Sequence, residues 1–480
     1  MNEKKEVGIT AKKSSNFVDW YSEVVIKSGL AEYGPVHGTI VFSPNSYAMW
    51  EEVQKAFDKL IKETGHKNAY FPLLIPESLL NKEAEHFKSF VPEVFWVTHE
   101  GEKELTDKYA IRPTSETIIY YFFSKWLRSW RDLPILVNQW CSVLRAEIKD
   151  TKPFIRNSEF LWQEGHTAHE TEAEADKEVM LILDFYRKIA EEYLAIPVIA
   201  GKKSELEKFG GAYYTTTIES IMPDGKAIQM GTSHNLGQNF SKPFGVKYLG
   251  RDNLEHSAWT TSWGISTRLL GALVMTHGDD SGLIMPPKVA GTQIVIIPII
   301  KKESLNEVTQ FAKELRGKLS QKFRVELDLR DDVTPGYKFN DWEMKGVPLR
   351  IEVGPKDIKN GVVVLVRRDT KEKKEVKHAD LEEEASKLLE AIQATLFLRA
   401  KESLKSLITE AKTYKELQEV IKSKGGFVKI NWCLGDACEL KIKEDTNATS
   451  RVIPFAEKRH GKCIVCGKDT EAVAYFAKSY

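Results

Sequence analysis

Hydrophobic residues recur at helical spacing in two segments of the first half of the chain. Between Pro44 and Gly65 they return every three or four residues, which predicts a helix with one buried face: Met49, Val53, Phe57, Leu60 and Ile61. Thr171 and Glu174 form a capping box that opens a second helix. The apolar run Ala69–Pro76 carries prolines and predicts an edge or interface strand rather than a central one.

A β-hairpin is predicted over residues 213–230. Its strands, Tyr213–Ile221 and Ala227–Met230, flank the turn Met222-Pro223-Asp224-Gly225-Lys226, which is a strong local signal. Strands that pair locally, with helices set apart from them, indicate an α+β domain. We expect this domain to cover residues 17–287, after a polar, lysine-rich flexible arm at residues 1–16.

The pattern changes after Pro286-Pro287, where strands and helices begin to alternate. This alternation predicts a small, mostly parallel sheet with helices on both faces, over residues 288–395. A last domain, residues 396–480, begins with a charged helical stretch and continues as short strands. The strands expected in the alternating part are Gln293–Ile300, Arg324–Leu329, Leu349–Val353 and Val362–Val366, and the helices are Leu305–Leu319, one near Asn340 and one from Asp380.

Composition narrows the class of protein. Lys+Arg and Asp+Glu each number 69, so the net charge is zero, which excludes a protein that is basic overall but allows a local basic surface for nucleic acid. Apolar residues make up 42% and charged residues 29%, which is typical of a globular chain rather than a disordered one. Since neither a membrane-length apolar run nor a secretory signal is present, we expect a cytoplasmic protein without membrane contact.

Four of the five cysteines lie near the C-terminus in two pairs. Cys433 and Cys438 are followed after 24 residues by Cys463 and Cys466. Paired spacing in an intracellular chain indicates metal binding more often than disulfides. Four thiolates complete a tetrahedral zinc site with no open position, so we expect a structural Zn²⁺.

Polar residues gather where a sheet core should be apolar. Arg145 and Glu147, two apart, are expected on one side of a strand, Arg156 on the following loop, and alternate residues of the returning strand on one face: Phe160, Trp162, Glu164 and His166. A solvated hairpin with a salt bridge is the common alternative for an Arg-x-Glu pair. The aromatic and histidine residues on the same face favour a binding site.

Three further segments carry candidate chemistry. Thr114 and Glu116 suit either a capped helix start or a hydroxyl and carboxylate that receive a cationic amine. Residues 229–238, with Gln229, Thr232 and His234, are expected where a strand ends, as a polar turn or a place where a ligand approaches the backbone. Arg268 follows Ser266 at a strand-to-helix junction, either as a surface charge or as a phosphate contact.

In this order along the chain, these segments resemble the motifs of the class II aminoacyl-tRNA synthetases, and specifically the archaeal and eukaryotic type of the prolyl-tRNA synthetase family. The segment ending at Pro72 resembles motif 1, Arg145–His166 motif 2, and Gly264–Arg268 motif 3. Residues 336–352 resemble the family's anticodon-binding domain, and the zinc module with Tyr480 matches its C-terminal domain. The span from His166 to Gly264 leaves no room for an editing insertion.

The resemblance implies an antiparallel catalytic domain, an α/β anticodon-binding domain and a small zinc-containing α+β domain. It also implies ATP with Mg²⁺, L-proline and tRNA(Pro) as substrates, and a homodimer formed through motif 1. Arg145, Glu147 and Arg268 would be catalytic. ATP would be bound by Arg145, Glu147, Arg156, Phe160, Gln229, Thr232, Ser266 and Arg268; proline by Thr114, Glu116, Arg145, Trp162, Glu164, His166 and His234; and the anticodon by Glu343, Arg350 and Lys356.

Two alternatives stay open at this point. One is a synthetase-like paralogue that binds RNA or regulates without aminoacylation. The other is an ATP-dependent ligase for a different amino acid or a carrier protein. Intact motif arginines argue against the first, and the Thr114/Glu116 pair with Trp162 and His166 argues against the second.

Overall fold

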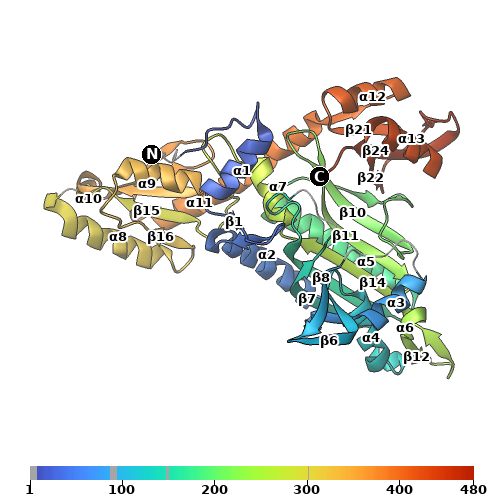
Figure 1. Cartoon of the computed structure of the whole chain (residues 1–480). Coiled ribbons are helices and arrows are strands. Elements are labelled where there is room, and N and C mark those ends of the chain that lie inside the picture. Colours follow the sequence, from blue (N-terminus) through green and yellow to red (C-terminus); the bar gives the residue numbers. More distant parts are fainter. Residues whose placement is uncertain (1–7, 87–93, 147–150, 301) are drawn as a thin grey trace.

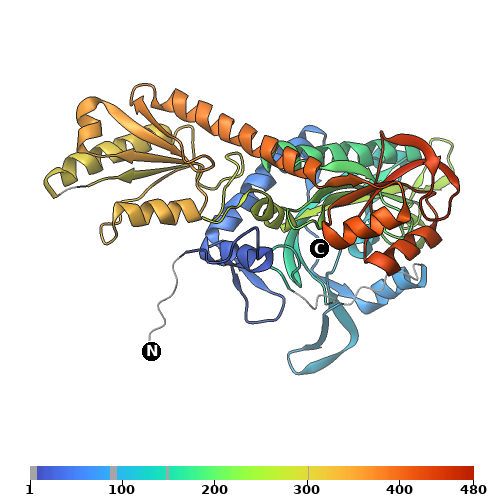
Figure 2. The same cartoon turned by 90° about the horizontal axis from the view of Figure 1, so that it is seen from above.

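The computed structural model describes residues 8–86, 94–146, 151–300 and 302–480. Figure 1 shows the α/β domain at one end of the molecule and the C-terminal domain beside the catalytic domain at the other. A single long helix, α11 (Leu381–Ser406), connects them and runs through the boundary expected between residues 395 and 396 (Figure 2).

The catalytic domain contributes seven neighbouring strands, in the order β9-β10-β11-β14-β8-β7-β3, to a twelve-stranded sheet of the described residues. Every neighbouring pair among these seven strands is antiparallel except β3 with β7. The antiparallel α+β core expected from the sequence is therefore confirmed. The strands are β3 (Lys67–Asn68), β7 (Ile135–Leu144), β8 (Glu159–His169), β9 (Ile199–Lys202), β10 (Tyr214–Ile221), β11 (Ala227–Gly237) and β14 (Trp259–Ser266).

Helices cover one face of this sheet. Phe57 of α2 and Tyr186 of α5 stack with ring centroids 5.3 Å apart, and Phe57 also meets Trp263 of β14. The predicted capping box is present, because Thr171 and Glu174 each accept a hydrogen bond from the other's backbone N–H. The helices of this layer are α1 (Phe17–Lys27), α2 (Pro44–Glu63), α5 (Glu172–Lys188) with the π-helical turn Ile189–Tyr193, and α7 (Arg268–His277).

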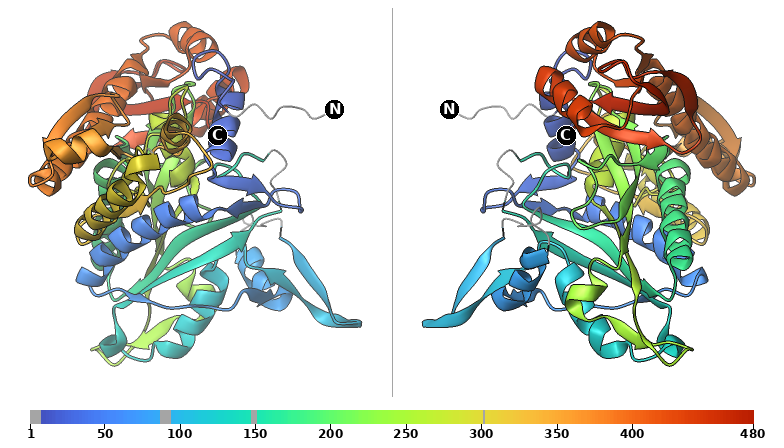
Figure 3. Two further views of the ribbon diagram at one scale, coloured as in Figure 1. Left: turned by 90° about the vertical axis from the view of Figure 1, so that its left-hand side faces the viewer. Right: turned by 90° about the vertical axis from the view of Figure 1, so that its right-hand side faces the viewer.

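Smaller elements surround the sheet. The hairpin β5–β6 projects from the body of the domain (Figures 2 and 3). These smaller elements are β1 (Ala31–Tyr33), β2 (Ile40–Phe42), β4 (Leu74–Pro76), α3 (Glu77–His86), β5 (Trp96–Glu100), β6 (Lys103–Ile111), α4 (Glu116–Trp126), the 3₁₀ turn Trp130–Asp132, α6 (Ser241–Phe244), β12 (Lys247–Leu249) and β13 (Glu255–Ser257).

Two local predictions were wrong. The run Ala69–Pro76 is not one strand: β3 ends before it and pairs with β7, while its last three residues form β4, which pairs with β6. Pro72 has no N–H to donate to a ladder, and the chain changes sheets around it. Residues 229–238 do not follow the end of a strand, since β11 continues to Gly237 with β10 on one side and β14 on the other.

The second domain has a five-strand sheet of order β16-β15-β17-β18-β19. Only β15 with β16 and β15 with β17 are parallel, so the prediction of a mostly parallel sheet was wrong. Helices α8 and α11 cover one face and α9 the other, as expected. The elements are β15 (Ile294–Pro298), the 3₁₀ turn Lys302–Ser304, α8 (Leu305–Leu319), β16 (Val325–Leu327), α9 (Pro335–Met344), β17 (Leu349–Val353), α10 (Pro355–Asn360), β18 (Val362–Arg367) and β19 (Lys373–Lys377).

The C-terminal domain continues the catalytic sheet. Ile453 of β22 pairs with Lys202 of β9, so β9 is shared by strands from both domains. No helix of the described residues has the length and apolar character needed to cross a membrane. The elements are β20 (Ile408–Glu410), α12 (Tyr414–Ser423), β21 (Phe427–Asn431), α13 (Asp436–Thr446), β22 (Thr449–Pro454), β23 (Lys458–Lys462) and β24 (Asp469–Ala477).

Candidate active site

A cavity of about 600 Å³ lies on the sheet face opposite α2 and α5. It gathers most of the residues proposed from the sequence, although they span more than 150 positions of the chain. Arg156 does not line it and is exposed on the loop after β7, while Glu147 lies outside the described residues. The predicted residues that do line it are Thr114, Glu116, Arg145, Phe160, Trp162, Glu164, His166, Gln229, Thr232, His234, Ser266 and Arg268.

Strand alternation explains how β8 forms the floor. Successive side chains of a strand point to opposite faces, so every second residue from Phe160 to His166 enters the cavity. The residue between Glu164 and His166 is glycine for a steric reason: a Cβ on Gly165 would lie 2.0 Å from the ring of Trp263. The Trp263 ring packs against the β8 backbone at this point and meets Phe57 of α2.

Glu164 is the centre of a buried hydrogen-bond network. The side chain is 2% exposed and accepts from Ser115, from Gln139 Nε2 at 2.9 Å and from His166 Nε2 at 3.0 Å. Burial raises the pKa of Glu164, but its hydrogen bond and charge contact with His166, followed by the Ser115 hydroxyl, outweigh burial and hold the pKa below its ordinary value. The carboxylate is therefore ionised at neutral pH.

Thr114 and Glu116 form a short polar turn at the start of α4. The Thr114 hydroxyl donates to Glu116 Oε2 at 2.5 Å, and both side chains reach the cavity. Arg112, which is buried, supports this turn by donating to the carbonyls of Phe71 at 3.0 Å and Ser142 at 3.0 Å. The helix cap is Ser115, whose side chain makes no capping bond, and Arg112 ties the chain just before the turn to residues 71 and 142.

Two arginines give the cavity its positive charge. Arg145 follows directly after β7, and its guanidinium lies 5.3 Å from the ring of Phe160 and 5.7 Å from that of Trp162. Arg268, at the junction of β14 and α7, donates from Nε to the carbonyl of Ile155 at 3.3 Å. Burial, and next the charge of Arg145, lowers the pKa of Arg268 to about 10, so Arg268 stays charged at pH 7. Close, partly buried like charges indicate a site for an anion.

His234 forms the far wall of the cavity together with Phe209, which was not predicted from the sequence as a site residue. Its Nδ1 lies 2.9 Å from Thr215 Oγ1, and its ring packs on Phe209 with centroids 4.8 Å apart. Burial, and then the neighbouring His166, lowers the pKa of His234 to about 3. The ring is therefore neutral at physiological pH and does not repel a bound cation.

Several lining residues were not singled out from the sequence as site residues: Glu207, Phe209, Thr215, Ser262 and Trp263. Ser262 was within reach, because it precedes Gly264 and Ser266 by the two-residue period of β14. Glu207, Phe209 and Thr215 come from the loop after β9 and the start of β10. Their sequence carries no periodic signal, and only the tertiary fold brings them to the cavity.

A smaller pocket of about 140 Å³ lies in the second domain. Glu343 and Arg350, predicted as anticodon readers, both line it, together with Trp342, Arg368 and Lys371. Glu343 pairs with Lys371 at 2.8 Å, and Arg350 pairs with Glu352 at 2.8 Å. Lys356 lies elsewhere, exposed on α10.

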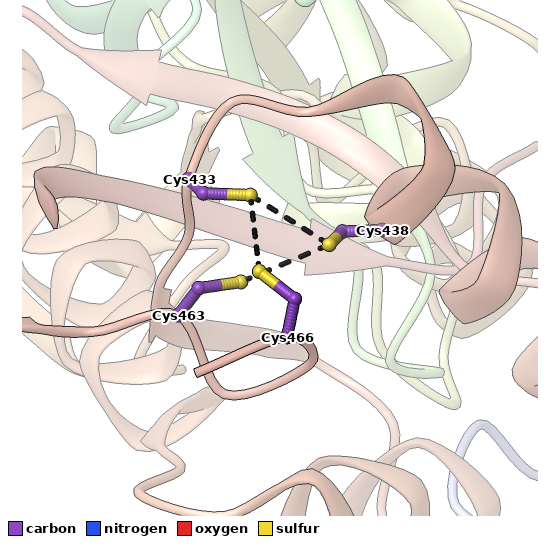
Figure 4. A group of neighbouring side chains, drawn as sticks. All are labelled: Cys433, Cys438, Cys463 and Cys466. Carbon is purple, nitrogen blue, oxygen red and sulfur yellow. Dashed lines mark hydrogen bonds between the residues drawn. The ribbon is translucent and has the colours of Figure 1, made fainter. Parts of the chain in front are cut away.

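The four C-terminal cysteines converge, as their spacing predicted. Their sulfur atoms lie within 4.8 Å of one another, with Cys433 3.6 Å from Cys438 and 3.7 Å from Cys466 (Figure 4). Tetrahedral zinc with bonds of about 2.3 Å would place sulfurs about 3.8 Å apart. The cluster therefore has the size and the donor chemistry for Zn²⁺.

These features define a class II aminoacyl-tRNA synthetase: an antiparallel sheet that carries a polar cavity with two arginines and several carboxylates, followed by a separate α/β domain. Residues 95–277 match the family model for the tRNA synthetase class II core domain (G, H, P, S and T), and residues 293–388 match the anticodon binding domain. Residues 414–480 match the model "Prolyl-tRNA synthetase, C-terminal".

Curated relatives narrow the class to one family. The chain is 53% identical to a proline–tRNA ligase of Alkaliphilus oremlandii over 97% of this chain and 96% of that protein. It is 51% identical to the corresponding enzyme of Cenarchaeum symbiosum, over 99% of this chain and 100% of that protein. The enzyme of Natranaerobius thermophilus is also 51% identical. The chain belongs to the prolyl-tRNA synthetase family, which confirms the resemblance seen in its sequence.

Proposed function

We propose that the enzyme activates L-proline with ATP to prolyl-adenylate and pyrophosphate, and then transfers the prolyl group to the 3′ end of tRNA(Pro). The observation that carries this proposal is the composition of the large cavity. It places a carboxylate and hydroxyl pair, Glu116 with Thr114, and two arginines, Arg145 and Arg268, around one space. A zwitterionic imino acid and a polyphosphate need these opposite charges.

The first step requires positioning and charge neutralisation rather than a base. An α-carboxyl group titrates near about 3.5, so the nucleophile is already an anion at pH 7. In our proposal, Arg145 bridges the proline carboxylate and the α-phosphate of ATP. Its planar guanidinium can bind one oxygen of each, and stacking near Phe160 and Trp162 limits its movement.

We assign the remaining ATP contacts to residues around that arginine. Arg268 would bind the γ-phosphate and Arg156 would assist from its loop, with Phe160 stacking on adenine. Gln229, Thr232 and Ser266 would hold ribose and phosphates, and Glu147 would lie near the adenine amine. Mg²⁺ would lie between the phosphates of ATP and an acidic or amide side chain of the cavity.

The proline end would be read by charge and by shape. Glu116 and Thr114 would accept hydrogen bonds from the secondary ammonium group, and Trp162 would offer an aromatic face to the ring. Glu164, which accepts hydrogen bonds from Ser115 and Gln139, would hold His166 next to the proline ring. His234, neutral at pH 7, would complete the pocket.

The other domains would hold tRNA and metal. Glu343 and Arg350 line a pocket suited to an unstacked base, and Lys356 would contact a phosphate outside it. The alternative is that Glu343 and Arg350 only form ion pairs on the domain surface, with Lys371 and Glu352, and do not contact the anticodon. Cys433, Cys438, Cys463 and Cys466 would hold a structural Zn²⁺. We also propose a cytoplasmic location, where charged tRNA(Pro) is used in protein synthesis.

ATP–pyrophosphate exchange measured across all amino acids tests the proposed function. Proline should support exchange far better than any other amino acid, with alanine a weak second. Alanine lacks ring methylenes, and each one is worth roughly 1–3 kcal/mol of discrimination. Equal exchange with several unrelated amino acids would contradict the assignment. No exchange with any amino acid, but retained tRNA binding, would favour the non-aminoacylating paralogue.

We also propose a homodimer formed through the motif 1 region. Exposed apolar side chains gather in and around β1–β2 and β4–β6, including Val36, Val41 and Tyr70, which is 70% exposed. Figure 3 shows the hairpins β1–β2 and β5–β6 projecting from the same side. An apolar group of this kind on one side is typical of an interaction surface.

Sedimentation velocity tests the dimer. The enzyme should sediment with twice the mass of one chain, and Val41→Asp should shift it toward the monomer because a buried, unpaired carboxylate opposes association. Leu398→Asp, a matched change at an exposed leucine of α11, should leave the dimer intact. A wild-type monomer, or equal effects of the two variants, would contradict this interface.

A further inference from the structure

The segment between β9 and β10 forms one wall of the large cavity. Glu207 and Phe209 line the cavity from this segment. Phe209 packs on His234, and its backbone N–H donates to Thr215 Oγ1 at 3.0 Å. The position of Phe209 therefore decides the shape of the pocket around His234.

The C-terminal domain holds the same segment from behind. Ser204 Oγ donates to Glu439 Oε1 at 2.9 Å, and Thr449 Oγ1 donates to Glu207 Oε2 at 3.3 Å. Arg451 lies 3.6 Å from that same carboxylate oxygen. Each of these contacts joins residues more than 230 positions apart, from two different domains.

A buried ion cluster fixes the beginning of the segment. Lys203 Nζ donates to Glu219 Oε1 at 2.6 Å and to the carbonyl of Arg451 at 3.0 Å. Arg451 in turn donates to Glu219 Oε2 at 3.1 Å. All three side chains are nearly inaccessible to solvent, so removing one would leave a buried charge without its partner. The junction of the domains is therefore rigid at this point.

Within the segment, local hydrogen bonds form a turn. A turn is closed by the backbone N–H groups of Glu207 and Lys208, which donate to the carbonyl of Ser204 at 3.3 and 2.9 Å. Without β22, strand β9 would also be an unpaired sheet edge on that side. Both domains therefore hold this wall, and the C-terminal domain supplies the side-chain contacts to the Ser204 hydroxyl across the domain boundary and to the Glu207 carboxylate.

We propose that the C-terminal domain sets the affinity of the cavity for proline by holding residues 203–209, with Glu439, Thr449 and Arg451 as positioning residues. This inference rests on the proposed function of the cavity. Glu439 follows Cys438 in α13, so the cysteine cluster fixes the start of the helix that carries it. The cluster is connected in this way to the amino-acid pocket, whose residues it does not touch.

Glu439→Ala in the full-length, zinc-loaded enzyme is the test. Without the acceptor for Ser204, the KM for proline in pyrophosphate exchange should rise roughly tenfold, because a small displacement of a pocket wall weakens binding strongly. The KM for ATP should stay within about twofold. Glu439→Gln should restore the proline KM, since its amide oxygen accepts the same hydrogen bond.

Three further measurements separate positioning from loss of structure. Asp445→Ala, on the same helix but bonded to Tyr414, should leave the proline KM unchanged. Ser204→Ala should raise the proline KM at least as much as Glu439→Ala, because the Ser204 hydroxyl also accepts from the Glu207 N–H at 3.3 Å, and the double variant should be no worse than Ser204→Ala. Amide hydrogen exchange of the peptide 203–213 should be faster in Glu439→Ala, with zinc content equal to that of the wild type.

An unchanged proline KM in Glu439→Ala would overturn the inference. So would an equal rise in the KM values for proline and for ATP, or additive effects in the double variant. The exchange measurement on peptide 203–213 does not depend on the substrate. Suppose the wild type fails to activate proline, yet Glu439→Ala shows faster amide hydrogen exchange in this peptide. That result would refute the proposed function but support the positioning role of Glu439.

Discussion

Arg145→Lys is expected to lower the rate of proline-dependent pyrophosphate exchange by about 10²–10³-fold, the usual cost of removing a group that stabilises developing charge. The lysine keeps the positive charge but lacks the planar guanidinium, whose N–H groups can bind two oxygens at once. A compact ammonium group cannot hold a carboxylate oxygen and a phosphate oxygen in fixed planar geometry, and it loses the stacking that Arg145 makes near Phe160 and Trp162. The loss should appear mainly in kcat, because the two oxygens come together only as the bond forms.

The matched control is Arg251→Lys in the same domain. Arg251 is exposed and lies over the ring of Trp130, away from the cavity. Its replacement should leave exchange within about twofold of the wild type, because it contacts no proposed substrate group. Wild-type turnover by the Arg145→Lys enzyme would refute the bridging role and would leave Arg145 as a general source of positive charge.

Glu164→Ala is expected to reduce the free energy of unfolding of the catalytic domain by about 3–5 kcal/mol, the range for breaking a buried, paired charge. Ser115, Gln139 and His166 would each lose a buried partner. Urea unfolding measures the effect, and Glu51→Ala, at an exposed position of α2, should change stability by less than about 0.5 kcal/mol. A loss equally small at Glu164 would show that the network does not stabilise the fold.

The same carboxylate predicts a pH dependence. Its pKa in the folded enzyme is held below the ordinary 4.5, so its contribution to stability is complete above pH 4.5 and is lost as pH falls through the folded pKa. The stability difference between the wild type and Glu164→Gln should therefore shrink as the pH is lowered below 4.5. A difference that grows toward acid pH would contradict the ionised state of Glu164.

Much of this enzyme could be predicted from sequence because the signals are local. The helix Pro44–Glu63 follows from hydrophobic spacing within one segment, and the capping box at Thr171 from two residues three apart. Alternation along β8 predicted which residues face the cavity, since a two-residue period is a property of any strand. The spacing of the four cysteines likewise predicted a cluster before any coordinates.

Other features needed the tertiary structure. The sheet of the second domain was predicted to be mostly parallel, but β17 and β18 are antiparallel. An alternation of strands and helices along the chain does not reveal whether two successive strands pair parallel or antiparallel. The sequence by itself determined the family, most helices and strands, and the site residues of β8 and of the junction between β14 and α7. Only the fold decided that β22 pairs with β9 and that Phe209 and Glu439 act on one wall. Such contacts join residues hundreds of positions apart, and their energy depends on burial and geometry that no local pattern records.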